Sequence, residues 1–344
     1  MKADVYKATQ HFASLYETAP AEYSFARSSG DFPAWRNGLR QRVRQTLGLD
    51  TMAHDLRDHR VCAELRGEER VDELLRQEWV VWTEPTVPLP VYVLKRADAD
   101  GRLPVVLTPH GHNRPHIYAG IWHTDEEREH MISGERDIAV QAAREGYLAV
   151  APTTRAFGET RTEEDIENDT LSSCGIALKH ALLVGRTPIG ERVWDMMRLI
   201  DWLTGRDDAD TGRVAITGNS GGGTVSLWAA AMDERIGVSV PSCYFCTFVG
   251  SIGSIRHCDC NYVPGMLRMG EMYDIAGLTA PRPFRAIAGR DDPIFPLAHV
   301  EAAFARLQEI YAAAGAPKRC ELYIGEGGHR YYADGAWPFM RTWL

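Results

Sequence analysis

The sequence lacks three features that would assign it to a membrane, a secretion route or a nucleic acid. It has no apolar run near the roughly 20 residues that a membrane-spanning helix needs. Its N-terminal stretch, MKADVYKATQHFASLYETAP, has no apolar segment of the kind found in secretory signal peptides. A formal net charge of -9 disfavours an anionic polymer such as DNA as a partner. We therefore expect a cytoplasmic protein that binds neither membranes nor nucleic acid.

Cysteine is also sparse, with seven in 344 residues. An odd count in a chain of this size argues against a disulfide framework and favours reduced thiols. No internal repeat and no low-complexity segment is present. The composition, 44% hydrophobic and 25% charged, is that of an ordinary globular protein. The length suits one large α/β domain with an extension.

The first part of the chain has helical rather than strand periodicity. Apolar residues at helical spacing precede a stop at Gly48; they are Trp35, Leu39, Val43 and Leu47. Short segments rich in β-branched and aromatic residues, such as EWVVWT, begin only near residue 78. We therefore predict a helical N-terminal extension over residues 1–75.

Strands and helices alternate through most of residues 76–344. Apolar strand-like runs such as GRVAITG are separated by amphipathic stretches such as IGERVWDMMRLIDWLTG. This alternation predicts a mostly parallel sheet with helices on both faces. Two stretches, 156–190 and 242–282, fit the alternation less well and are candidate insertions over the top of the sheet.

The segment ITGNSGGGTVSLW places a serine between glycines where an apolar strand meets a helix. Gly218 and Gly222 flank Ser220 at the spacing of a nucleophile elbow, in which the serine occupies a strained turn and a Cβ at either glycine would clash. Because both the strand and the helix are present, we interpret Ser220 as a nucleophile rather than as part of an ordinary turn.

The expected partners follow the serine in the order acid, then histidine. AGRDDPIFP comes directly after a strand, and Asp292, followed by proline, is the preferred acid, with Asp291 as the alternative. His329 lies in GEGGH just after the final strand. The imidazole would accept the Ser220 proton, and the carboxylate would hold the ring in the correct tautomer.

An oxyanion hole needs two backbone N–H donors. One should be Gly221, which follows the nucleophile at a helix N-terminus. The other should come from the loop TPHGHNRP, where we prefer the amide of His112 and keep Asn113 as an alternative. His110 and His112 could instead be metal ligands, but their position beside Gly111 favours the oxyanion loop.

These motifs together resemble the α/β-hydrolase superfamily, and most closely its dienelactone hydrolase and acetyl xylan esterase-like branch. The resemblance spans about residues 75 to 344 and is most specific in HGH, GNSGGG, CDCNYVPG, MYDIAGLTAPRP, AGRDDPIFP and GEGGH. It implies an α/β-hydrolase catalytic domain over residues 76–344 that hydrolyses carboxylic esters through an acyl-enzyme, commonly on acetylated carbohydrates. Dienelactone hydrolases proper use a cysteine nucleophile, so Ser220 argues for an ordinary esterase. By the same resemblance, Arg155 and Gly158 brace the site.

Four cysteines cluster in the sequence and offer a competing interpretation. They are Cys243, Cys246, Cys258 and Cys260, with His257 alongside. Four thiols could bind zinc, but the C-x-C spacing is tight and the intervening residues are apolar, which favours buried free thiols. We therefore expect no metal and no cofactor. Tyr244, Phe245 and Tyr262 in the same segment are candidates for the substrate pocket.

Two other functions remain as alternatives to a serine esterase acting on a small-molecule or carbohydrate ester. A peptidase of the prolyl oligopeptidase type would share the elbow and the triad, but no run of repeated short strands precedes the domain. A non-catalytic binding protein with a cysteine or zinc site would usually lack a triad member, whereas all three can be assigned here.

Overall fold

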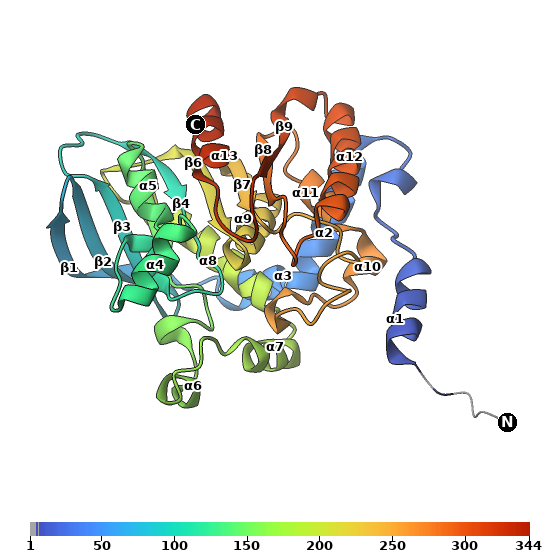
Figure 1. Ribbon diagram of the computed structural model, residues 1–344, viewed down its shortest axis with the longest axis horizontal. Coiled ribbons are helices and arrows are strands. Elements are labelled where there is room, and N and C mark those ends of the chain that lie inside the picture. The colour runs from blue at the N-terminus through green and yellow to red at the C-terminus, as the bar shows by residue number, and fades with distance from the viewer. Residues whose placement is uncertain (1–4, 6) are drawn as a thin grey trace.

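The computed structural model describes residue 5 and residues 7–344 (Figure 1). Nine strands form one sheet in the order β1-β2-β3-β5-β4-β6-β7-β8-β9. The strands β1 to β3 and the β3–β5 pair are antiparallel, and every pairing from β5 to β9 is parallel. The strands are β1 (Cys62–Val71), β2 (Leu74–Glu84), β3 (Val87–Arg96), β4 (Leu103–Leu107), β5 (Leu148–Pro152), β6 (Ala209–Asn219), β7 (Ile236–Ser242), β8 (Phe284–Gly289) and β9 (Cys320–Gly325).

Helices cover both faces of this sheet, as the alternation predicted. Val105 and Leu107 of β4 join the core shared with α2, α8, α9 and α12, whereas Val106 joins the core shared with α5 and α13. The helices are α1 (Ala8–Glu17), α2 (Phe32–Leu47), α3 (Leu49–Asp55), α4 (Asp125–Ser133), α5 (Ile138–Arg144), α6 (Glu163–Glu167), α7 (Cys174–Leu183), α8 (Pro188–Leu203), α9 (Gly221–Met232), α10 (Met266–Met269), α11 (Met272–Gly277), α12 (Leu297–Ala313) and α13 (Ala333–Trp343).

The N-terminal region is helical over α1 to α3 but not over the whole expected range. The apolar residues predicted to share one face of α2 are buried, and Gly48 ends the helix with φ 82°. β1, however, begins at Cys62, within the stretch 1–75 that we expected to be helical. The prediction of a helical extension up to residue 75 was therefore wrong at its end. β1 is an edge strand whose residues are mostly exposed and charged, so they show no apolar alternation.

The two candidate insertions meet each other in space. Residues 156–190 contain α6 and α7, which are seen at the lower edge of Figure 1. Residues 242–282 contain a short 3-10 turn, η4 (Asp259–Asn261), followed by α10 and α11. Phe157 and Cys174 from the first segment and Cys260 from the second share a small buried cluster. Among the residues described, no helix is both long enough and apolar enough to cross a membrane.

Candidate active site

Ser220 occupies a strained turn between β6 and α9. Its backbone has φ 57° and ψ -118°, a conformation that a residue with a side chain rarely adopts. A Cβ added at Gly218 would lie 2.3 Å from the Pro109 carbonyl oxygen, and one at Gly222 would lie 2.1 Å from the same atom. Both positions therefore require glycine, and the elbow geometry expected from the sequence is present.

An acid–base pair follows β8 and β9, the last two strands of the sheet. His329 Nδ1 and Asp292 Oδ2 are 2.7 Å apart, and the Asp292 side chain is 1% exposed. The other Asp292 oxygen accepts hydrogen bonds from the amides of Ile294, at 2.9 Å, and Phe295, at 3.2 Å. Asp291 is exposed. The geometry therefore pairs His329 with Asp292 and not with the alternative acid.

The serine and the histidine open into one cavity of about 390 Å³. Ser220 and His329 both line it, together with His112, Asn113 and Asn219. The ring of His329 stacks on Phe295, with centroids 5.8 Å apart, which fixes the plane of the imidazole. A substrate in this cavity would therefore reach the hydroxyl, the imidazole and the HGHN loop together.

The loop after β4 lies directly against the elbow. A Cβ added at Gly111 would be 2.6 Å from the Asn219 carbonyl oxygen and 3.2 Å from both Ser220 Cβ and the Gly221 nitrogen. The absence of a side chain at Gly111 thus allows the two segments that carry the expected amide donors, Gly221 and His112, to touch. Gly221 also begins α9, where the helix dipole favours a developing negative charge.

His110 has a structural place in this loop. It is 1% exposed, its Nδ1 is 2.7 Å from the Gly111 oxygen, and its Nε2 accepts a hydrogen bond from the Thr154 amide at 2.8 Å. Burial lowers the pKa of His110 to about 3, so the ring is neutral. Both ring nitrogens are engaged with the backbone, so His110 ties the loop to the segment after β5.

Basic side chains dominate the charged groups of the cavity wall. Arg136 and Arg256 line it with His130 and His257, and none of its lining residues is a carboxylate. Arg136 donates a hydrogen bond to the His130 carbonyl oxygen, and no carboxylate pairs with it in the described part of the chain. Burial lowers the pKa of Arg136 below its usual range and that of His257 to about 4. Arg136 was not expected from the sequence, because nothing in its polar surroundings distinguishes it from a surface arginine.

The prediction that three aromatic residues line the substrate pocket is wrong. Tyr244 and Phe245 are at most 1% exposed and belong to the main hydrophobic core. The Tyr244 hydroxyl accepts a hydrogen bond from Trp228 Nε1 at 3.0 Å, and Phe245 contacts Phe284 edge-on. Tyr262 lines a different cavity, beside α1, and donates a hydrogen bond to the Ile252 oxygen. The chain after β7 turns inward, so its aromatic side chains stabilise the core rather than the cavity wall.

Arg155 and Gly158 support the site from behind. The mostly buried Arg155 guanidinium contacts Asp195 at 2.7 and 2.8 Å and Glu84 at 2.6 Å. Gly158 has φ 50°, and a Cβ there would lie 2.8 Å from Pro115 in the loop after β4. Neither residue lines the cavity that contains Ser220. These contacts fit the expected bracing role.

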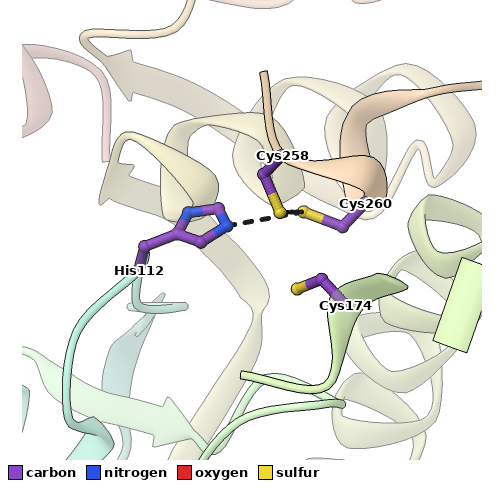
Figure 2. A group of neighbouring side chains, drawn as sticks. All are labelled: His112, Cys174, Cys258 and Cys260. Carbon is purple, nitrogen blue, oxygen red and sulfur yellow. Dashed lines mark hydrogen bonds between the residues drawn. The ribbon is translucent and has the colours of Figure 1, made fainter. Parts of the chain in front are cut away.

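The four cysteines that are close in the sequence do not form one group in the fold. Cys246 is buried on its own beside Met272, and Cys243 lies next to Asp292 and His329. The Cys243 thiol donates to the Arg330 oxygen at 3.2 Å, and burial raises its pKa to about 12. Cys258 and Cys260 instead meet Cys174 and His112 (Figure 2). These segments come together only in the fold, so spacing in the sequence could not show that these four residues are neighbours.

Comparisons with known proteins agree with this architecture. A family model described as X-Pro dipeptidyl-peptidase (S15 family) matches residues 86–252, which include the elbow but end before Asp292 and His329. "Putative hydrolase YtaP" of Bacillus subtilis is 26% identical over 316 residues, covering 88% of this chain and all of that protein. A solved structure from Bacteroides fragilis NCTC 9343, titled a "putative acetyl xylan esterase", has a TM-score of 0.77 at 16% identity and covers 94% of this chain and 82% of its own. Methylesterase BT1017 has a TM-score of 0.68 at 21% identity, with 97% and 66% covered.

The parallel sheet, the elbow and these similarities lead to the same assignment. The chain has the α/β-hydrolase fold, and its resemblance to the dienelactone hydrolase and acetyl xylan esterase-like branch of that superfamily is confirmed.

Proposed function

We propose that this protein is a serine carboxylesterase in which Ser220, His329 and Asp292 form the catalytic triad. One observation carries the proposal. The buried Asp292 carboxylate holds His329 Nδ1 at 2.7 Å, and this imidazole lines the same cavity as a serine on a strained strand-to-helix turn. A serine hydroxyl becomes a useful nucleophile when a base so oriented removes its proton.

The reaction would proceed in two halves. His329 Nε2 takes the Ser220 proton as the hydroxyl oxygen attacks the ester carbonyl, and the leaving alcohol then takes that proton from the imidazole. The product is an acyl-enzyme ester on Ser220. Water attacks this ester, with His329 again accepting a proton and returning it to the serine oxygen. Asp292 stays ionised throughout and stabilises the imidazolium formed in each half.

The negative charge of each tetrahedral intermediate would be stabilised by backbone amides. We assign the donors to Gly221 and His112, because Gly111 brings their two segments into contact beside Ser220. The amide of Asn113 is the alternative second donor. Backbone donors fixed in this way act most strongly where charge develops in the transition state, and losing one typically costs about 100–1,000-fold in turnover.

The cavity wall supports a polar or negatively charged substrate. Two arginines and no carboxylates line a cavity of about 390 Å³, so its charged groups favour a substrate that carries polar or acidic groups. The similar structures include an acetyl xylan esterase from Paenibacillus sp. R4 and a methylesterase. We therefore propose short-acyl or methyl esters of carbohydrates, including acidic ones, as the substrate class.

A peptidase is the second candidate, favoured by the match to the S15 dipeptidyl-peptidase model. The two functions share the triad and differ in the bond that is cleaved. Parallel assays with p-nitrophenyl acetate and an X-Pro p-nitroanilide would separate them. We expect turnover of the ester only, and turnover of the anilide with an inert ester would select the peptidase.

The esterase proposal is tested directly at the nucleophile. Ser220→Ala should lower turnover of p-nitrophenyl acetate on the order of a million-fold, and should abolish covalent labelling by a fluorophosphonate. Ser254→Ala, an exposed serine outside the cavity, is the matched control and should behave like wild type. A folded wild-type protein that turns over no ester and takes up no label would exclude a serine esterase.

A further inference from the structure

Four potential metal ligands meet beside the proposed active site. They are His112, Cys174, Cys258 and Cys260, and their ligating atoms all lie within 4.8 Å of one another. Cys258 Sγ and Cys260 Sγ are 3.2 Å apart, and Cys260 Sγ is 3.7 Å from His112 Nε2. Figure 2 shows the four side chains converging on one space from three segments of the chain.

The spacing suits a tetrahedral zinc ion. Zinc binds thiolate sulfur at about 2.3 Å and imidazole nitrogen at about 2.0–2.1 Å, which places neighbouring ligand atoms roughly 3.5–3.8 Å apart in a tetrahedron. The separations of 3.2 and 3.7 Å lie close to that range. Small rotations of the side chains would therefore complete the geometry.

A buried arginine lies beside the cysteines, and its positive charge is opposite to that of a group of thiolates. Arg192 is 2% exposed, and it donates from Nη2 to Cys174 Sγ at 3.5 Å and to the Arg155 carbonyl oxygen at 2.9 Å. Its Nε is buried without a hydrogen-bond partner. Across residues 5 and 7–344, no carboxylate pairs with this guanidinium. A buried arginine without a counter-charge is costly, so an anionic group is expected next to it.

We propose that His112, Cys174, Cys258 and Cys260 bind one Zn²⁺ ion. Each of the three thiols loses a proton to solvent, and three thiolates with a neutral imidazole leave the complex with a net charge of -1. Arg192 balances that charge. Because all four coordination positions are filled by protein, the site is structural rather than catalytic.

The metal site lies where a bound ion would stabilise the wall of the cavity that contains Ser220. His112 follows Gly111 in the loop that lies against the elbow, Cys174 begins α7, and Cys258 lines the cavity that contains Ser220. The ion would cross-link three segments of the chain that no disulfide joins and would hold the cavity wall in place. The binding of zinc does not depend on the proposed esterase function.

The first test measures the metal on the full chain. Protein purified under reducing conditions, stripped with a chelator and given Zn²⁺, should hold one zinc per chain by mass spectrometry of the element. X-ray absorption should show a mixed sulfur and nitrogen shell. Co²⁺ in place of zinc should give the intense thiolate-to-cobalt absorption bands of a tetrahedral site. A folded, reduced chain that retains no Zn²⁺ after gel filtration would overturn the proposal.

The second test assigns the ligands. Cys260→Ser and Cys174→Ser should each lower zinc retention at least tenfold. The matched controls are Cys320→Ser, a buried cysteine elsewhere, and Cys62→Ser, an exposed one, and both should retain the ion. A disulfide among Cys174, Cys258 and Cys260 in the native protein, seen as a mass lower by two hydrogens, would contradict the site. Undiminished zinc binding in both ligand variants would do the same.

If the ligand variants fail to fold, wild-type protein still decides the question. Chelation should expose three additional thiols to a thiol reagent and should lower the melting temperature, and Zn²⁺ should reverse both effects. Zinc binding without ester hydrolysis would support the metal site and reject the proposed function. Hydrolysis without zinc binding would do the opposite.

Discussion

Asp292 holds His329 Nδ1 at 2.7 Å with one carboxylate oxygen, while its other oxygen accepts hydrogen bonds from the amides of Ile294 and Phe295. Both oxygens of this buried carboxylate are thus held by hydrogen bonds, whereas the neighbouring Asp291 side chain is exposed to solvent. The loop after β8 therefore distinguishes two adjacent aspartates by orientation alone.

Asp292→Asn should reduce turnover of p-nitrophenyl acetate by about 10,000-fold, because an amide stabilises the wrong imidazole tautomer. Asp291→Asn is the matched control in the next position and should retain activity close to wild type. Circular dichroism would verify that both variants are folded. Equal losses in the two variants would contradict the assignment of Asp292 as the acid.

The glycines of the elbow provide a test of stability. Gly222→Ala should lower the free energy of unfolding by about 1–3 kcal/mol or prevent folding, since overpacking against rigid backbone has costs of this order. The cause is the added Cβ, which would lie 2.1 Å from the Pro109 carbonyl oxygen. Gly205→Ala, whose Cβ would lie 3.6 Å from the Trp202 oxygen, is the control and should be tolerated in chemical denaturation.

Much of this architecture was predictable because its signals are local. The alternation from residue 76 onward indicates buried strands and amphipathic helices. The glycines that flank Ser220 indicate a turn with no room for a Cβ at their positions. The spacing of the apolar residues in α2 predicted its buried face and its end at Gly48. In each case the physical constraint acts within one element, so the sequence of that element carries it.

The errors arose where contacts join distant segments. Cys174 approaches Cys258 and Cys260 only because α7 and η4 meet in the fold, and no spacing rule relates their positions. Tyr244 and Phe245 follow a strand that ends beside the site, yet their side chains turn into the core. β1 was missed because an exposed edge strand needs no apolar pattern.

A buried acid remote from the cavity predicts a pH dependence of stability. Asp274 is fully buried, and burial raises its pKa from 3.8 to about 6, although it accepts hydrogen bonds from the amides of Phe25 and Glu271. The folded state therefore binds a proton that the unfolded state releases between these values. The stability contributed by the neutral acid is complete below pH 3.8 and is lost as the pH rises through 6.

The matched comparison isolates this group from the other acids. The free energy of unfolding of wild type relative to Asp274→Asn should fall by about 2 kcal/mol between pH 4 and 6, because a tenfold change in proton affinity corresponds to about 1.36 kcal/mol. Urea denaturation at several pH values would measure it. The exposed Asp72→Asn should show no such trend, and a constant difference for Asp274→Asn would rule out the raised pKa.

Arg136 tests the proposed preference for acidic esters. It lines the cavity with Ser220, and its guanidinium donates to the His130 carbonyl oxygen but has no carboxylate partner in the described chain, so its charge is not neutralised and can attract an anionic group of the substrate. Arg136→Met should raise KM for a methyl ester of a uronic acid by roughly 10–100-fold, the equivalent of about 1.5–3 kcal/mol for a charged hydrogen bond. KM for neutral p-nitrophenyl acetate should change little. Arg128→Met, an exposed arginine on α4, is the control, and equal changes in KM for both esters would show that Arg136 does not recognise charge.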